Sequence, residues 1–132
     1  MNKIKKAGAL IFRDKKFLIV KPHGKPFYIN PGGKYGEGES AVDCLRRELK
    51  EELGIEMISC KHYKTYEIEK AAHSNLPLSL ELYIVEIKGE MKPSSEIEKL
   101  AWLNKEDFEN KKFNLAPSFS KYIPDLINDG LF

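Results

Sequence analysis

Apolar residues in the N-terminal part of the chain occur in short runs that are separated by turn-forming residues. The runs at 7–13 and 17–20 flank a polar segment at 14–16, which predicts two strands joined by a tight turn. An aromatic run at 27–29 predicts a further short strand. Residues 31–38 contain four glycines, and this predicts a loop with unusual backbone freedom.

From residue 40 the apolar positions follow a helical period, which predicts a helix over 40–53 with Gly54 as its C-cap. Two longer strands are predicted at 57–70 and 78–88. The remaining predicted elements are a connection at 71–77, a short strand at 100–103, a short helix at 105–110 and a helix at 117–128 that bends at Pro124. Strands and helices in this order predict a mixed sheet covered by helices.

The predicted helix over 40–53 carries a cluster of carboxylates. Glu52 lies about 40° and Glu51 about 60° around the helix axis from Glu48, on either side of it. An apolar stripe beside this acidic face consists of Val42, Leu45, Leu49 and Leu53. We therefore expect the helix to dock by this stripe and to present its glutamates at one exposed edge.

Composition and charge narrow the class of protein. With 132 residues, 42% hydrophobic and 32% charged, the chain is expected to form one globular domain over residues 1–132. A net charge of +2 is too small to predict stable binding to nucleic acid or to a membrane. The two cysteines have no metal-binding spacing, and the first apolar run is too short for a signal peptide, so a cytoplasmic protein is expected.

Clustered carboxylates are hard oxygen ligands of the kind that Mg²⁺ prefers. A solvated acidic helix face would look the same, and the glycines that precede the helix favour the metal site. Free N–H groups at a helix start attract anions, and glycines let the backbone approach a phosphate or a metal closely. Loop and helix together predict a site for a cation and an anionic, phosphate-containing substrate.

The segment 33–55 resembles the Nudix box, G-x5-E-x7-R-E-U-x-E-E-x-G-U, in which U is an apolar residue. It matches this motif at every fixed position, and these positions are Gly33, Glu39, Arg47, Glu48, Leu49, Glu51, Glu52, Gly54 and Ile55. Nine fixed positions at set spacing are a specific signal. Outside this box the resemblance is looser, although the strands before it and Trp102 after it fit the family.

This resemblance implies an α/β fold, namely a Nudix-type α/β/α sandwich with a mixed β-sheet and a loop–helix–loop catalytic box. It also implies an enzyme in which water attacks one phosphorus of a nucleoside diphosphate linked to a group X. The required cofactor is expected to be Mg²⁺, with Mn²⁺ as a possible substitute.

The family's metal ligands correspond to Glu48 and Glu52, with Glu51 as a third ligand or as the base that positions water. The carbonyl of Gly32 is the expected backbone ligand. Arg47 would hold Glu51 in place.

Within the box, Glu39 is expected to support the metal ligands from behind, and Gly33 and Gly54 are expected to have structural roles in the backbone. Many relatives use a further acidic residue beyond the box, for which Glu96 and Glu98 are candidates. Glu96 is preferred because it directly precedes an apolar residue.

Substrate contacts are harder to assign from the sequence. Asn114 follows Phe113 near the C-terminus, where some nucleotide-cleaning relatives place an asparagine that reads the base; a turn residue is the alternative. Phe27 and Tyr28 are candidates for stacking on a base, and Lys34 for contacting phosphates.

The leading functional hypothesis is a nucleoside triphosphate pyrophosphohydrolase that cleans the nucleotide pool. The alternatives are a hydrolase of nucleotide sugars (ADP-ribose-like) or of dinucleoside polyphosphates on the same fold. A non-catalytic nucleotide-binding module is a third hypothesis, although all three box glutamates are present. Both a monomer and a homodimer are compatible with the sequence.

Overall fold

The computed structural model describes residues 3–71 and 74–132. The strands in these ranges are β1 (Ile4–Leu10), β2 (Phe12–Arg13), β3 (Lys16–Pro22), β4 (Gly32–Lys34), β5 (Glu56–Ile68), β6 (Leu78–Lys88) and β7 (Ile97–Leu103). The helices are α1 (Ala41–Leu53), α2 (Lys105–Glu109) and α3 (Ser118–Asn128). The connection predicted at 71–77 includes 72–73, which lie outside the described residues.

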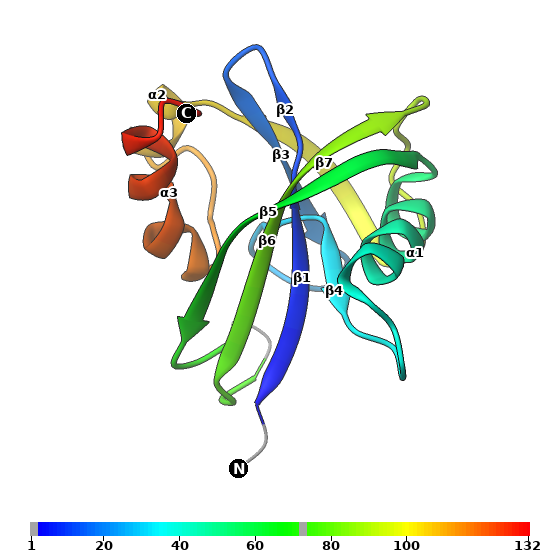
Figure 1. Cartoon of the computed structure of the whole chain (residues 1–132). Helices are drawn as coiled ribbons and strands as arrows, with labels where there is room; N and C mark the ends of the chain where they lie inside the picture. Colours follow the sequence, from blue (N-terminus) through cyan, green and yellow to red (C-terminus); the bar gives the residue numbers. More distant parts are fainter. Residues whose placement is uncertain (1–2, 72–73) are drawn as a thin grey trace.

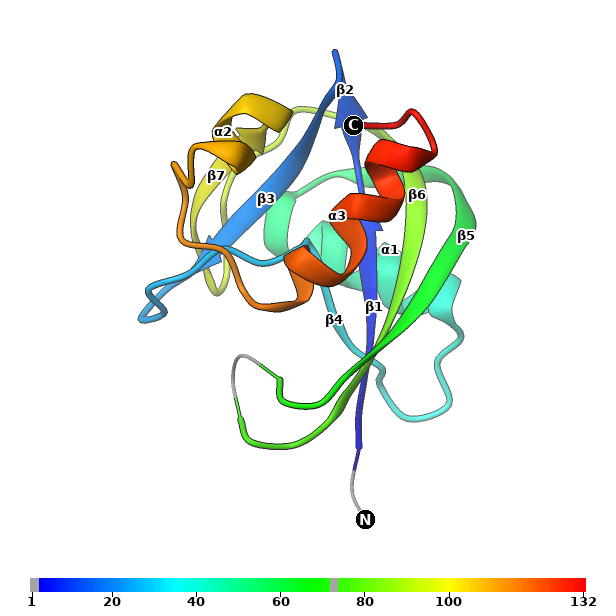
Figure 2. The same cartoon turned by 90° about the vertical axis from the view of Figure 1, so that its left-hand side faces the viewer.

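The strands form two sheets rather than one. The first has the order β4-β1-β6-β5; β1 runs parallel to β6, and the other pairs are antiparallel. The second sheet is antiparallel, with the order β2-β3-β7. Helices α1 and α3 lie on opposite sides of the strands (Figure 1), and α3 crosses in front of β1 when the molecule is turned (Figure 2). The predicted α/β/α sandwich is confirmed, and the first sheet is the mixed one.

The two faces of β3 show why the core has two halves. Phe17 and Ile19 belong to the apolar cluster that includes α3, whereas Leu18 and Val20 belong to the cluster that includes α1. All four side chains are fully buried. Because successive side chains of a strand point to opposite faces, a continuous apolar run predicts a strand covered on both sides.

Helix α1 begins and ends within one residue of its prediction. The Ser40 side chain accepts a hydrogen bond from the Asp43 N–H at 3.1 Å, which caps the first turn. Gly54 ends the helix in the left-handed conformation (φ 68°), and its N–H donates to the Lys50 carbonyl. This C-cap confirms the predicted role of Gly54 in the backbone.

The buried face of α1 differs from the predicted stripe. Val42 is 38% exposed, whereas Cys44 is fully buried and Glu52 is only 8% exposed. The prediction of an exposed edge is therefore wrong for Glu52. The helix is rotated so that its i, i+4 row of Cys44, Glu48 and Glu52 faces β4, whose two glycines have no side chains to hold the helix away.

Two further elements differ from their predictions. Residues 32–34 form strand β4 against β1, with Gly33 opposite Ala7, rather than a loop. Residues 27–29 form no strand and make only single bridges, to Val20 and Leu115. The ladder of β4 consists of backbone hydrogen bonds, so a strand of glycines leaves no trace in a hydrophobic pattern.

The predicted strand at 7–13 is also divided, between β1 and β2 in different sheets, and only β2 pairs with β3 across the tight turn. The remaining elements are close to their predictions. Strand β6 has the predicted bounds, and β7 begins three positions earlier than expected. Helix α3 contains Pro124 within its bounds. Among the described residues, every helix is too short or too polar to cross a bilayer.

The rotation of α1 predicts different costs for two truncations on the same predicted stripe. Leu45→Ala removes a fully buried side chain and should lower the free energy of unfolding by about 2–5 kcal/mol. Val42→Ala should change it by less than about 0.5 kcal/mol, because Val42 is partly in water. Urea unfolding of both variants measures the difference; equal losses would contradict the rotated face.

Candidate active site

A pocket beside β4 and α1 gathers carboxylates and lysines from distant parts of the chain. Glu48 and Glu52 come from α1, and Glu96 comes from the segment before β7. The other residues that line this carboxylate pocket are Lys6, Pro22, His23, Lys25, Ile29, Gly32, Lys34, Ser95 and Ile97. The same pocket is therefore lined by negatively charged carboxylates and by positively charged lysines.

Glu52 is the most deeply buried carboxylate of this group. Its Oε1 accepts a hydrogen bond from the Gly32 N–H at 3.0 Å. Burial raises the pKa of Glu52 to about 8, and the neighbouring charges of Glu48, Glu96 and Glu51 add to the effect. A buried carboxylate with one hydrogen bond and three negative neighbours is costly to ionise without a cation nearby.

The two glycines of β4 are required for different reasons. Gly32 has φ 129°, and a Cβ there would lie 2.1 Å from the backbone oxygen of Ala7. A Cβ on Gly33 would lie 2.7 Å from the carboxyl carbon of Glu48, the movable end of a side chain. Gly32 thus allows the strand to form, and Gly33 leaves room for the Glu48 carboxylate.

Arg47 connects the glycine-rich segment with the helix. Its guanidinium donates to both carboxylate oxygens of Glu39, at 2.6 and 2.8 Å, and to the Lys34 carbonyl at 3.2 Å. It also donates to Glu48 at 2.9 Å and to Glu51 at 3.5 Å. Arg47 therefore contacts Glu51, as the sequence suggested, but its main partner is Glu39.

Glu39 is fixed from both sides. Besides Arg47, the Gly36 N–H donates to Glu39 Oε1 at 2.6 Å. The Arg47 guanidinium and this backbone donor lower the pKa of Glu39 to about 2. Glu39 accordingly keeps its charge over the working pH range and anchors the segment between β4 and α1.

The segment before β7 reaches the site because it covers the end of α1. The last carbonyls of a helix have no partner inside the helix. Here the Ser94 side chain donates to the Glu51 carbonyl at 2.6 Å, and the Ser94 and Lys92 N–H groups donate to the carbonyls of Glu52 and Leu53. This docking places the segment that carries Glu96 along the pocket.

Two acidic side chains point away from the carboxylate pocket. Glu98 pairs with Lys21 at 3.1 Å, which lowers its pKa. The Glu51 side chain is 52% exposed and does not line the pocket, although its charge raises the pKa of both Glu48 and Glu52. Of the two candidates beyond the box, Glu96 is the one beside Glu48 and Glu52.

Of the substrate contacts suggested by the sequence, only Lys34 lines the carboxylate pocket. The Asn114 amide donates to the Pro26 carbonyl at 2.6 Å, and Asn114 lines a separate depression with Phe108. Tyr28 packs edge-on against Phe113 at 5.2 Å, and Phe27 packs against the α3 cluster. The structure does not bring these three residues to the carboxylates.

The sequence reading missed two residues that face the site, Lys6 and Asn30. Lys6 lines the carboxylate pocket from β1, and burial lowers its pKa, with Lys34 adding to the effect. Asn30 is a buried polar residue directly before Pro31. The only sequence signal was a lysine in an otherwise apolar strand and an asparagine next to the glycine-rich segment.

The donor set suits a hard divalent cation, since carboxylates are the ligands that Mg²⁺ and Mn²⁺ accept. Burial with negative neighbours also raises the pKa of Glu52, so a cation would relieve an unfavourable charge. Within residues 3–71 and 74–132, no three acidic, His or Cys side chains already converge as a metal cage. Arg47 instead neutralises Glu48 at 2.9 Å.

The fold and this pocket define the class of protein, an α/β domain whose carboxylates gather where a glycine strand meets a helix. The sequence profile of the NUDIX domain matches residues 3–126. The chain therefore belongs to the Nudix family.

Individual relatives agree with this assignment. The chain is 32% identical over 100 residues to YvcI of Bacillus subtilis (strain 168), an uncharacterized Nudix hydrolase; the match covers 74% of this chain and 63% of that protein. The solution structure of the E. coli ORF135 protein is similar with a TM-score of 0.70 and 29% identity, over 89% of this chain and 83% of that chain. The MutT Nudix hydrolase of Burkholderia pseudomallei has a TM-score of 0.69 and 26% identity, over 78% and 84%.

The burial of Glu52 predicts a pH dependence of stability without metal. Its folded pKa, about 8, lies above the unfolded value, so the folded state holds the extra proton and stability falls as pH rises towards about 8. Glu52→Gln keeps the acceptor for Gly32 and removes the charge. We expect this variant to be more stable than the wild type at pH 9, by roughly 2–4 kcal/mol, and similar at pH 4.5.

Chemical unfolding in EDTA at both pH values measures this difference. Glu98→Gln is the matched control, because Lys21 lowers the pKa of Glu98 and the variant should therefore lose stability at high pH. A Glu52→Gln protein that is less stable than the wild type at pH 9 would show that Glu52 is not a strained buried charge.

Proposed function

We propose that this protein is a nucleoside triphosphate pyrophosphohydrolase that depends on Mg²⁺, or on Mn²⁺ in its place. Water would attack one of the two phosphorus atoms of the α–β phosphoanhydride bond, that bond would break, and a nucleoside monophosphate and pyrophosphate would be released. The likeness to a MutT Nudix hydrolase supports a hydrolase activity.

The observation that carries the proposal is the mixed charge of the carboxylate pocket. This pocket is lined by three carboxylates and three lysines. The carboxylates belong to Glu48, Glu52 and Glu96, and the lysines are Lys6, Lys25 and Lys34. Carboxylates alone would repel a triphosphate, and lysines alone would not hold a divalent cation. Both sets together suit a substrate whose phosphates are bound partly through a cation and partly through ammonium groups.

The residues that would hold the cation are Glu48 and Glu52, with Glu96 and the Gly32 carbonyl completing the oxygen ligands. Glu51 lies farther out, and we assign it a smaller effect through its charge and its contact with Arg47. When bound, the cation supplies charge neutralisation of the phosphates and acidifies a bound water.

The chain's own groups position the reactants. The Arg47–Glu39 pair holds the segment after β4 against α1, so that the carboxylate of Glu48 keeps its place beside Gly33. Lys6 and Lys34 would orient phosphate oxygens from the other side of the pocket. Positioning and electrostatics of this kind account for most of the catalysis of phosphoryl transfer.

Removing a single charge from the pocket tests the proposal. Glu52→Gln and Glu48→Gln should each lower kcat with the preferred nucleotide by about a hundredfold or more at limiting Mg²⁺, because one anionic ligand is lost. Glu51→Gln should have a smaller effect. The measurements are pyrophosphate release and identification of both products over a panel of nucleoside triphosphates, nucleotide sugars and dinucleoside polyphosphates, with Mg²⁺, Mn²⁺ or EDTA.

Asp43→Asn is the matched control, since it makes the same change at an exposed position of the same helix. Near-native turnover of Glu52→Gln at limiting Mg²⁺ would refute the ligand assignment. Cleavage confined to nucleotide sugars or dinucleoside polyphosphates would replace the proposed substrate class and leave the metal site in place. Binding without hydrolysis of any compound would identify a non-catalytic module.

Substitutions of the two glycines of β4 should distinguish an effect on catalysis from an effect on stability. Gly33→Ala should lower kcat by about tenfold or more with little change in Tm, because the added Cβ displaces the Glu48 carboxylate rather than backbone. Gly32→Ala should lower Tm markedly, since its Cβ meets the Ala7 carbonyl. Thermal unfolding and steady-state kinetics of both variants decide the point. Parallel losses of Tm and kcat in Gly33→Ala would make Gly33 a purely structural glycine.

A further inference from the structure

A second pocket shares a wall with the carboxylate pocket. Lys6, Ile29 and Gly32 line both. The second pocket continues between β1, β6 and the start of α3, and its remaining lining is mostly apolar; it includes Ile68, Leu78, Leu80, Ala116 and Pro117. A molecule with phosphates at the carboxylates could therefore place its other end between these apolar side chains.

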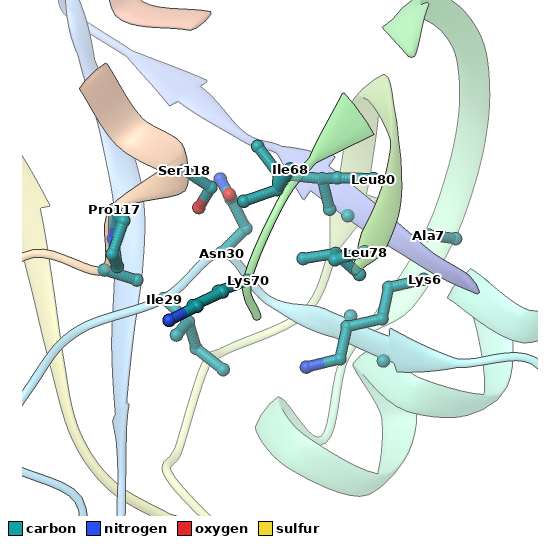
Figure 3. A pocket seen from close by; sticks show the side chains of 14 residues that line it. Lys6, Ala7, Ile29, Asn30, Ile68, Lys70, Leu78, Leu80, Pro117 and Ser118 are labelled. Atoms are coloured by element: carbon teal, nitrogen blue, oxygen red, sulfur yellow. The ribbon is translucent and has the colours of Figure 1, made fainter. Parts of the chain in front are cut away.

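Besides Lys6, the polar side chains of Asn30, Lys70 and Ser118 interrupt this apolar lining, and Asn30 is the buried one among them. Asn30 is only 8% exposed, and its Nδ2 has no hydrogen-bond partner among the described residues. Figure 3 shows Asn30 beside Ser118 towards one end of the pocket and Lys6 towards the other. Buried N–H groups in native proteins almost always have an acceptor, so an unpaired one in a pocket wall indicates an acceptor on a ligand.

The orientation of the Asn30 amide is fixed by Tyr122. The Tyr122 hydroxyl donates to Asn30 Oδ1 at 2.9 Å. Tyr122 is fully buried and packs against the rings of Phe119 and Phe17. The amide oxygen thus faces the Tyr122 hydroxyl, and the NH₂ group is the part of Asn30 that has no partner among the described residues.

We propose that the second pocket binds the base of the nucleotide and that Asn30 donates a hydrogen bond to a ring carbonyl oxygen of that base. Bases with an oxo group at this edge are thereby selected over bases with an amino group. This inference rests on the proposed function, because the base lies in the second pocket only if the phosphates occupy the first. Tyr122 acts as a positioning residue that keeps the donor turned towards the base.

The chemistry of the two ends of the pocket supports a base as the occupant. Apolar walls suit the faces of a flat ring, and the buried donor of Asn30 suits an acceptor at the ring's edge. An amino group of the base in the same place would face the NH₂ group of Asn30, and neither of these two donors would have an acceptor. Sites built around one hydrogen bond reject the analogue that cannot make it more strongly than apolar pockets reject a change of size.

The experiment compares substrates that exchange an oxo group for an amino group, ITP with ATP and UTP with CTP. In the wild-type protein the ratio of kcat/KM should favour the oxo member of the better-hydrolysed pair by about tenfold or more. Asn30→Leu should bring this ratio close to one while hydrolysis of the amino member persists. Asn128→Leu, the same substitution at an exposed position of α3, should leave the ratio unchanged.

Tyr122→Phe isolates the positioning role. It keeps the ring packing and releases the Asn30 oxygen, so the amide can turn, and the ratio should fall to an intermediate value. Asn30→Leu could fail to fold because the Tyr122 hydroxyl loses its acceptor. In that case the double variant Asn30→Leu/Tyr122→Phe, which removes both partners together, replaces Asn30→Leu in the comparison. A wild-type ratio retained in the folded Asn30 variant overturns the inference.

A binding measurement separates this inference from the proposed function. Isothermal titration of IMP, UMP, AMP and CMP into the protein in EDTA should show the same oxo preference and the same dependence on Asn30. Binding with this preference but without hydrolysis would refute the proposed function and keep the base site. Hydrolysis or binding without a preference for oxo bases would refute the base site. A preference that is abolished by Asn114→Ala but not by Asn30→Leu would refute it as well. If the protein shows neither hydrolysis nor nucleotide binding, the proposed function and the base site are both refuted.

Discussion

The close approach of α1 to a strand of two glycines is the constraint on which the site depends. Cys44, Glu48 and Glu52, one helical turn apart, all face Gly32 and Gly33. A side chain on Gly33 would displace the Glu48 carboxylate, and one on Gly32 would meet the backbone oxygen of Ala7 on β1. The glycines thus do more than supply a flexible loop, because their missing side chains create the space in which two carboxylates are held beside a backbone.

This arrangement places charge where it is poorly solvated, and the surrounding structure compensates only in part. Arg47 neutralises Glu48 and is itself held by Glu39, while the Gly32 N–H serves Glu52. Burial, together with the negative charges of Glu48, Glu96 and Glu51, still raises the pKa of Glu52. Without a cation, Glu52 therefore holds a proton below a pH of about 8, and a cation bound beside it would take the place of that proton.

Under the proposed function, the two pockets with a common wall would divide hydrolysis from recognition of the base. The carboxylate pocket depends on residues of the Nudix box and on the segment that covers the end of α1. The second pocket is built mainly from β1, β6 and the start of α3, and Gly33 is the box residue that lines it. Substrate selection can therefore vary within this fold without disturbing the carboxylates, which explains why a conspicuous motif predicts a reaction type but not a base.

The sequence by itself determined the family, the bounds of α1 to within one residue with its C-cap, and the identity of the box carboxylates, because these are local patterns of spacing. Only the tertiary structure decided that Glu52 is buried while Val42 is exposed, since the rotation of a helix depends on the strand packed against it. A strand of glycines cannot be predicted from hydrophobicity, because its pairing uses backbone atoms alone. Glu96 and Asn30 meet the site through contacts distant in sequence, whereas Asn114 is tied elsewhere by the Pro26 carbonyl.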